Sequence, residues 1–206
     1  MRRSLSVLAC LVAVALFGAS SAAADTAQLR FGHTNVVQAV NSNSAAPVVR
    51  TGTALGFDQN GAAVTDGNIA FAHSFDCTGC RTVAVAIQVV VVQGSPSSFQ
   101  PENGAAAVND NCHSCQTFAY AHQYVIQITR IPEGFNPGEG TVEQVGTILS
   151  NISQVAHSNE DFVTMSSQLD QLSLELYNTV SQALQSQNHG DGGHKADEHR
   201  QAQEKD

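Results

Sequence analysis

The chain has 206 residues, with 18 acidic side chains against 9 lysines and arginines, and its formal net charge is −9 at pH 7. Such a chain has no basic footprint for nucleic acid or for an anionic membrane surface, so partners of both kinds are excluded. The length suits one domain, or one domain with an appendage.

The first 24 residues have the pattern of a secretory signal peptide. Arginines near the start precede an apolar stretch, residues 5–17, that is too short to span a bilayer. Small residues just before Asp25 offer a signal peptidase site, so we expect cleavage there and a secreted or cell-surface protein. Cys10 is not expected to carry a lipid, because almost no apolar run precedes it. No membrane span is expected after cleavage, since residues 83–92 have only about half the required length.

Residues 25–131 are expected to form a β domain. The stretch 47–57 has the composition of a strand, and turn-forming residues follow it in "DQNG" and "TDGN". We predict about six to eight mostly antiparallel strands in this domain, arranged as a small sandwich or as a meander that curls on itself.

An internal duplication dominates the β domain. Residues 68–92 align with residues 103–127 at an offset of 35, and 10 of the 25 positions are identical. A fainter third copy precedes them, since residues 35–44 match "NGAAAVNDNC" at five of ten positions, with Ser44 where Cys112 stands. Each full copy holds a strand, a Cys-x-x-Cys connection and a longer strand, so we predict a β-hairpin in each copy.

The identical residues of the longer strand fall at every second position, which is typical of a strand with two distinct faces. The β-branched residues between them are expected to face the core. The sequence leaves open whether the shared face meets water or is covered by a second layer. The core face comprises Val83, Val85 and Ile87, with Phe118, Tyr120, His122 and Tyr124 in the second copy, and the shared face comprises Thr82, Ala84, Ala86 and Gln88.

A helical hairpin is predicted after the β domain. Residues 132–140 form a linker rich in glycine and proline, and apolar residues then recur at helical spacing through residues 141–187. Ser158 with Asp161 forms a capping box that begins the second helix. The fold class is therefore mainly β, with antiparallel duplicated hairpins followed by a helical hairpin, and α+β overall. The polar residues 188–206 are expected to be disordered.

The apolar stripe of these helices has two alternative uses. We favour packing on the β domain of the same chain, because the glycine-bearing linker can turn the chain back. In the alternative, the stripe binds a protein partner or forms a homo-oligomer, since an exposed patch of that size seldom stays in water. The leucines that decide between them are Leu169, Leu172, Leu176 and Leu184.

The cysteines that remain after cleavage are Cys77, Cys80, Cys112 and Cys115, in the two Cys-x-x-Cys pairs. Export exposes them to an oxidising environment, so we expect disulfides in one of the three connectivities that four cysteines allow. The alternative is a zinc site in which the same four thiolates bind the ion, with His73 and His113 as substitute ligands. Thiol–disulfide exchange is a weaker alternative, because a strand and not a helix follows each pair.

The double pattern of Cys-x-x-Cys and Thr-x-Ala-x-Ala-x-Gln, with Asn-x-Ala-x-Ala before it, resembles a module of secreted actinobacterial proteins over about residues 35–130. It is also similar to the extracytoplasmic part of some peptide zinc metalloproteases. The first resemblance implies no established activity. In the second group, peptidase activity belongs to a membrane-embedded portion with a His-Glu-x-x-His motif, which this sequence lacks.

The sequence thus predicts a non-catalytic secreted or cell-surface protein that acts by binding or assembly through a disulfide-pinned β domain. The alternative is an extracytoplasmic zinc-binding protein that uses the two Cys-x-x-Cys pairs. The first interpretation implies no catalytic residue and no cofactor, since the sequence has no nucleophile elbow and no glycine-rich phosphate loop after a strand.

Overall fold

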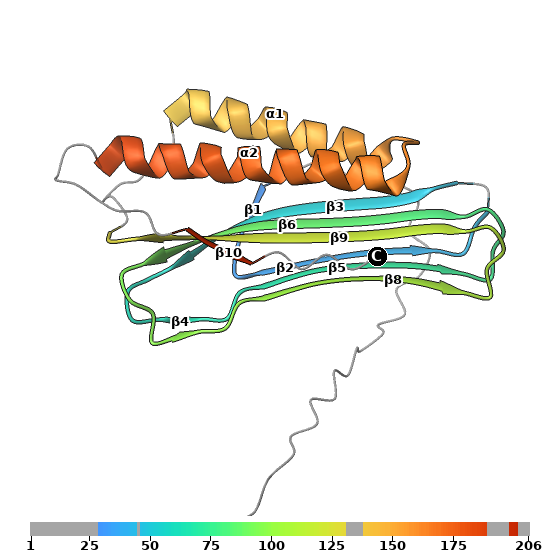
Figure 1. Ribbon diagram of the computed structural model, residues 1–206, viewed down its shortest axis with the longest axis horizontal. Helices are drawn as coiled ribbons and strands as arrows, with labels where there is room; N and C mark the ends of the chain where they lie inside the picture. The colour runs from blue at the N-terminus through green and yellow to red at the C-terminus, as the bar shows by residue number, and fades with distance from the viewer. Residues whose placement is uncertain (1–28, 45, 131–137, 189–197, 202–206) are drawn as a thin grey trace, which may run out of the picture.

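The computed structural model describes residues 29–44, 46–130, 138–188 and 198–201. The predicted signal peptide, most of the linker and most of the tail lie outside these residues. The described residues form two larger β-sheets stacked face to face, with two helices laid over one of them, and a small sheet in which residues 63–64 pair with residues 98–99 (Figure 1).

The elements follow one another as strands and then helices, with one short strand at the end. Their bounds are β1 (Leu29–Phe31), β2 (Thr34–Asn41), β3 (Val48–Asp58), β4 (Ala63–Val64), β5 (Gly67–Phe75), β6 (Arg81–Gln93), β7 (Ser98–Phe99), β8 (Glu102–Asp110), β9 (Gln116–Ile128), α1 (Gly138–His157), α2 (Phe162–Asn188) and β10 (Glu198–Gln201).

The copies stack on one another as layers of a short parallel solenoid. Strands β2, β5 and β8 form a three-stranded sheet, and β3, β6 and β9 are the central strands of a five-stranded sheet. Every pairing among these six strands is parallel. Thr82 lies opposite Thr117 and Gln88 opposite Gln123, so equivalent residues of the two full copies are direct neighbours.

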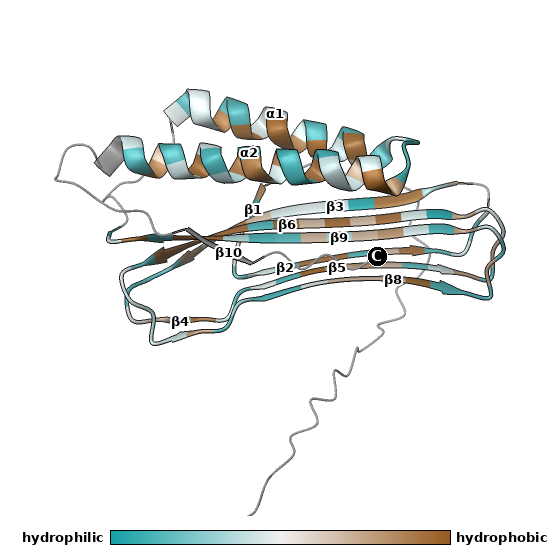
Figure 2. Ribbon diagram, in the orientation of Figure 1, coloured by the Kyte–Doolittle hydropathy of each residue, from teal (hydrophilic) through white to brown (hydrophobic). Residues whose placement is uncertain are grey.

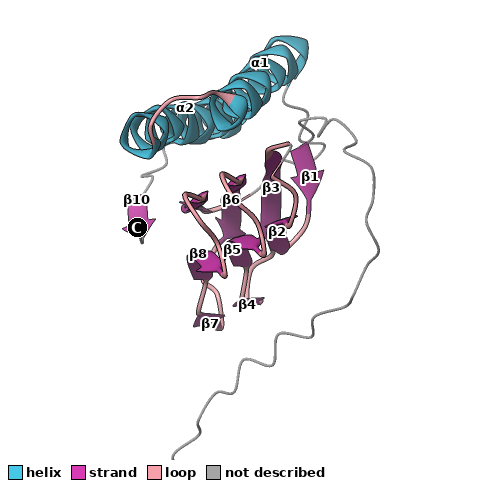
Figure 3. Ribbon diagram, turned by 90° about the vertical axis from the view of Figure 1, so that its right-hand side faces the viewer, coloured by secondary structure: helices cyan, strands magenta, loops and turns pink. Residues whose placement is uncertain are grey.

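The predicted antiparallel hairpins are wrong. Strands β5 and β6, which the first Cys-x-x-Cys turn joins, lie in different sheets and pair with their equivalents in other layers, and the same holds for β8 and β9 (Figure 3). Among the described residues, the antiparallel pairing is that of β10 with β9. The reason for the error is that period-two alternation identifies the two faces of a strand but carries no information about its partner.

The segment predicted as the third copy lies in the first layer of the stack. Asn35 pairs with Asn68, and Asn68 with Asn103, across β2, β5 and β8. Ser44 lies beside the first cysteine turn, where its Oγ accepts a hydrogen bond of 2.9 Å from the backbone N–H of Thr78. The layer without cysteines therefore still contacts the turn of the next layer.

Small side chains fill the space between the two sheets. Because alanine reaches only a short way from the backbone, the sheets approach closely. At Gly52, which pairs with Ala86, an added Cβ would lie 2.5 Å from Cγ2 of Val37 in the facing sheet. This close approach explains why alanine recurs at every second position. The residues of this layer are Val37, Ala39, Ala70, Ala72, Ala84, Ala86, Ala119 and Ala121.

Asparagines link the two sheets through the same interior. The two N–H groups on Nδ2 of Asn68 serve three acceptors: Oδ1 of Asn103 at 2.8 Å and the carbonyl oxygens of Ala86 and His122, each at 3.1 Å. Nδ2 of Asn35 in turn donates to Oδ1 of Asn68 at 2.8 Å. The ladder satisfies side-chain and backbone groups that burial would otherwise leave unpaired.

Both faces of β6 are buried, which answers the question that the sequence left open about the shared face. Val83, Val85 and Ile87 belong to the core beneath the helices, as predicted. Ala84 and Ala86 belong to the alanine layer between the sheets, and both are fully buried. A second sheet covers the face that the sequence pattern left open.

The helices pack on the five-stranded sheet and bury their apolar stripe there (Figure 2). Leu169, Leu176 and Leu184 are almost fully buried, and Leu172 is partly buried. The favoured prediction of packing within the chain is therefore confirmed, and this stripe is not available for a partner or a second copy. In the described part of the chain, neither helix has the length of apolar surface needed to cross a bilayer.

One polar contact joins the helices to the sheet, and another caps the start of α2. The hydroxyl of Tyr120 on β9 donates a hydrogen bond of 2.8 Å to Oδ1 of Asp170 on α2. The N-terminus of α2 is capped by Asp161, whose Oδ1 accepts from the backbone N–H of Thr164 at 3.0 Å. The predicted capping box placed the cap at Ser158, which instead lies in the connection between the helices and accepts from the N–H of Glu160 at 3.4 Å.

Candidate functional site

The four cysteines lie in two stacked turns where β5 passes into β6 and β8 passes into β9. In both turns the residue before each cysteine has a left-handed backbone. The φ angles are 50° at Asp76 and 68° at Gly79 in the first turn, and 49° at Asn111 and 55° at Ser114 in the second. Gly, Asn and Asp adopt this conformation most readily, and three of the four positions carry one of these residues. The two copies therefore form the same turn.

Backbone hydrogen bonds hold the two turns in register. The N–H of Gly79 donates to the carbonyl of His113 at 2.8 Å, and the N–H of His113 donates to the carbonyl of Cys77 at 3.1 Å. The N–H of Gln116 donates to the carbonyl of Cys80 at 2.7 Å. The first Cys-x-x-Cys pair is therefore stacked directly on the second.

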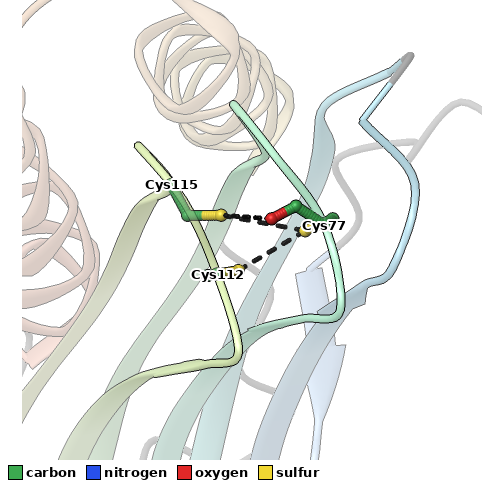
Figure 4. A group of neighbouring side chains, drawn as sticks. All are labelled: Cys77, Cys112 and Cys115. Atoms are coloured by element: carbon green, nitrogen blue, oxygen red, sulfur yellow. Dashed lines mark hydrogen bonds between the residues drawn. The ribbon is translucent and has the colours of Figure 1, made fainter.

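The sulfur atoms of the two turns gather in one group. Cys77 and Cys80 form a disulfide, which confirms the general expectation of a disulfide and gives a connectivity that the sequence had left open. Cys112 and Cys115 are free thiols, so the expected second disulfide is not formed. Sγ of Cys77 lies 3.5 Å from Sγ of Cys112 and 3.8 Å from Sγ of Cys115 (Figure 4).

The surroundings of the Cys112 thiol favour its neutral form. Removal from water raises the pKa of Cys112, and a hydrogen bond with the neighbouring Cys115 thiol raises it further. A hydrogen bond from the Cys77 backbone opposes these effects. Because the thiolate is both the nucleophile and the metal ligand, a raised pKa disfavours exchange chemistry and metal binding at neutral pH.

The proposed zinc ligands are only partly brought together. The Sγ atoms of Cys77, Cys112 and Cys115 lie within 4.8 Å of one another. The bond between Cys77 and Cys80 removes the thiolates that a four-sulfur site requires, so such a site needs the reduced protein.

The two histidines proposed as substitute ligands do not join this group. His73 lies on β5 in a row of rings, with centroids 5.9 Å from Phe71 and 5.3 Å from Phe75. His113 lies in the second cysteine turn, where its backbone bonds to Cys77 and Gly79 and its carbonyl accepts from Sγ of Cys115 at 3.8 Å, and its ring is not among the ligand-type groups gathered there. Neither imidazole therefore acts as a ligand beside the sulfurs.

A second group of ligand-type side chains, His33, Asp58 and Asp66, is not found by reasoning from the sequence. The two aspartates lie in "DQNG" and "TDGN", which indicate turns, and no spacing motif joins them to the histidine. The stack brings together the connection before β2, the end of β3 and the residue before β5. A sequence pattern cannot show this convergence, because it depends on which strands pair.

The three-stranded sheet lies on the far side of the five-stranded sheet from the helices (Figure 3), and its outward face carries exposed apolar side chains. Val36 is 54% exposed, Val40 41%, and Ile69 and Val108 39% each. The register places Val36 beside Ile69, and Val40 beside His73 and then Val108. Gln38, Phe71 and Ala106 lie between these two rows, and we call the outward positions of β2, β5 and β8 the outer face.

Comparison of the chain with protein-family models, with curated proteins and with solved structures finds no match. The resemblance to secreted actinobacterial proteins therefore stays a prediction, and the function has to be argued from the site geometry.

Proposed function

We propose that this protein is a secreted, non-catalytic structural protein in which a cysteine-pinned parallel stack presents the outer face for association. The uncovered apolar patch of Val36, Val40, Ile69 and Val108 carries the proposal, because apolar patches of this kind on soluble proteins commonly mark interaction sites. The recurring Asn and Ala residues of β5 and β8 support it. They are committed to the interior, which leaves the outward positions of the same strands free for recognition.

The occupant that we propose is a second copy of the same chain. Along β2, β5 and β8 the outward positions carry charge only at the two ends of β8, Glu102 and Asp110. The whole chain is acidic, so contacts between two copies through other surfaces bring carboxylates close to carboxylates. Contact through two outer faces brings apolar side chains together instead. Sheets bury apolar faces on one another about 10 Å apart, and a two-fold pairing needs one self-complementary patch on each copy.

Sedimentation velocity over a range of protein concentrations tests this proposal. We expect the exported protein to form a dimer, and Ile69→Glu to shift it to a monomer, because the substitution places two carboxylates in the centre of the interface. Val163→Glu is the matched control, since Val163 is an 82% exposed valine on α2, away from the outer face. This variant is expected to remain a dimer.

Two results would overturn the assignment. One is a wild-type protein that stays monomeric at every concentration. This holds even if that monomer binds a different protein. The other is dissociation by Val163→Glu with no effect of Ile69→Glu, because the interface would then lie on the helices.

Zinc binding by the cysteines is the second candidate function, favoured by the close approach of the sulfurs of Cys77, Cys112 and Cys115. Intact mass and metal content of the exported protein distinguish the two candidates. Each disulfide lowers the mass by about two hydrogen atoms relative to the reduced chain. One or two disulfides and no metal support a pinned scaffold. Free thiols with one equivalent of zinc, lost when Cys112 and Cys115 are replaced by serine, would make the zinc site the better assignment.

A further inference from the structure

The group of His33, Asp58 and Asp66 lies apart from the cysteines and from the outer face. Nδ1 of His33 is 3.2 Å from Oδ1 of Asp66 and 3.3 Å from Oδ1 of Asp58. One atom from each of the three side chains lies within 4.8 Å of the others. Three segments of the chain thus supply one nitrogen and two carboxylates to a single point.

The two carboxylates are buried without enough partners. The side chain of Asp66 is 0% exposed and that of Asp58 is 6% exposed. Among the described residues, Oδ2 of Asp58 and Oδ2 of Asp66 have no hydrogen-bond partner. A buried carboxylate is costly unless a cation or hydrogen bonds compensate it. The His33 side chain is 58% exposed, so solvent reaches the group from the side of His33, whereas the two carboxylates are buried.

Hydrogen bonds to the backbone of Asp66 and His33 hold these two residues in place. The carbonyl of Asp66 accepts from Nε2 of Gln123 at 3.2 Å and from the N–H of Glu102 at 2.8 Å. The carbonyl of His33 accepts from the N–H of Gly67 at 2.9 Å. At Gly56 an added Cβ would lie 2.7 Å from Oδ1 of Asp66, so only glycine leaves room for this carboxylate.

We propose that His33, Asp58 and Asp66 bind a divalent transition-metal ion, with zinc as the best fit. Zinc takes imidazole and carboxylate ligands at about 2.0–2.2 Å, which sets tetrahedral ligand atoms roughly 3.3–3.6 Å apart. The two measured nitrogen–oxygen distances lie close to that spacing. The imidazole favours zinc over calcium or magnesium, which take oxygen ligands.

Titration calorimetry with zinc chloride alone tests the site. The protein carries Cys112→Ser and Cys115→Ser, so that the sulfurs do not compete, and it is first treated with a chelator and shown to be folded by circular dichroism. We expect one zinc ion per chain and a melting temperature that rises with zinc. Calcium chloride is expected to give neither effect.

Asp66→Asn and His33→Gln locate the ion. Each is close in shape to the original residue, and each is expected to weaken zinc binding at least tenfold and to abolish the zinc-dependent rise in melting temperature. Asp110→Asn is the matched control, because Asp110 is an exposed aspartate on β8 outside the group, and it should bind as tightly as the parent. No zinc binding in the parent, unchanged binding in both site variants, or binding of calcium instead of zinc would each overturn the proposal.

Discussion

Asn68 and Asn103 occupy the same position in successive layers, and Nδ2 of the first lies 2.8 Å from Oδ1 of the second. A primary amide offers donors and an acceptor, so identical asparagines one layer apart can bond to each other along a parallel stack. Asn35 extends the ladder by one layer. This relationship identifies the recurring asparagine as a structural residue of the stack.

The ladder predicts that Asn68→Ala lowers the free energy of unfolding by about 2–4 kcal/mol. It leaves Oδ1 of Asn103 and two carbonyl oxygens in the buried interior without their donor. Urea denaturation measures the loss. Asn159→Ala is the control at an exposed asparagine between the helices, with an expected change within about 0.5 kcal/mol. Equal changes in the two variants would show that the ladder does not stabilise the stack.

Burial of both faces of β6 predicts that Ala84→Asp is as damaging as Val85→Asp. Each introduces an unpaired carboxylate at a fully buried position, and each should destabilise the fold by about 4 kcal/mol or prevent folding. Thermal unfolding and soluble yield measure the effect. Val163→Asp, at an exposed position, should be close to neutral. A mild effect of Ala84→Asp would mean that water reaches the space between the sheets.

Removal of residues 138–206 should make the β stack insoluble. The deletion uncovers the row of β-branched residues that the helices bury, which includes Val83, Val85 and Ile87. Soluble yield and binding of a hydrophobic dye report the exposed surface. A truncated chain that stays soluble and monomeric would contradict the packing role assigned to α1 and α2.

The metal-free protein should lose stability as the pH rises from about 4 to 7. Burial raises the pKa of Asp66 from 3.8 to about 7, with further contributions from a hydrogen bond and charge repulsion with Asp58, and His33 opposes the shift. The folded state thus holds a proton that the unfolded state releases at a lower pH. The resulting stability is fully present below the unfolded pKa and is lost as the pH rises through the folded pKa.

Urea denaturation at several pH values in the presence of a chelator measures this dependence. Asp66→Asn should flatten the slope, because the amide does not titrate, while Asp110→Asn should preserve it. Stability that increases between pH 4 and 7 in the parent would contradict the raised pKa.

Local patterns in the sequence were sufficient for the strands and helices around the duplicated units. The alternation of Val83, Ala84, Val85 and Ala86 identified a strand with two chemically distinct faces, and the heptad-like spacing of leucines identified the helices. These assignments depend on neighbours a few residues apart, whose side-chain directions follow from backbone geometry alone. The four cysteines predicted disulfides but not their connectivity, and the bond between Cys77 and Cys80 is known only from the structure.

The pairing of strands and the polar groups inside the stack required the tertiary structure. An alternating strand fits an antiparallel hairpin and a parallel layer equally well. Which pairing forms therefore depends on contacts between residues about 35 positions apart. The same long-range pairing brings His33, Asp58 and Asp66 together and buries Ala84. Alanine on the shared face is compatible with either water or a packed interior. In the structure, a second sheet built from the same repeated segments packs on this face in van der Waals contact.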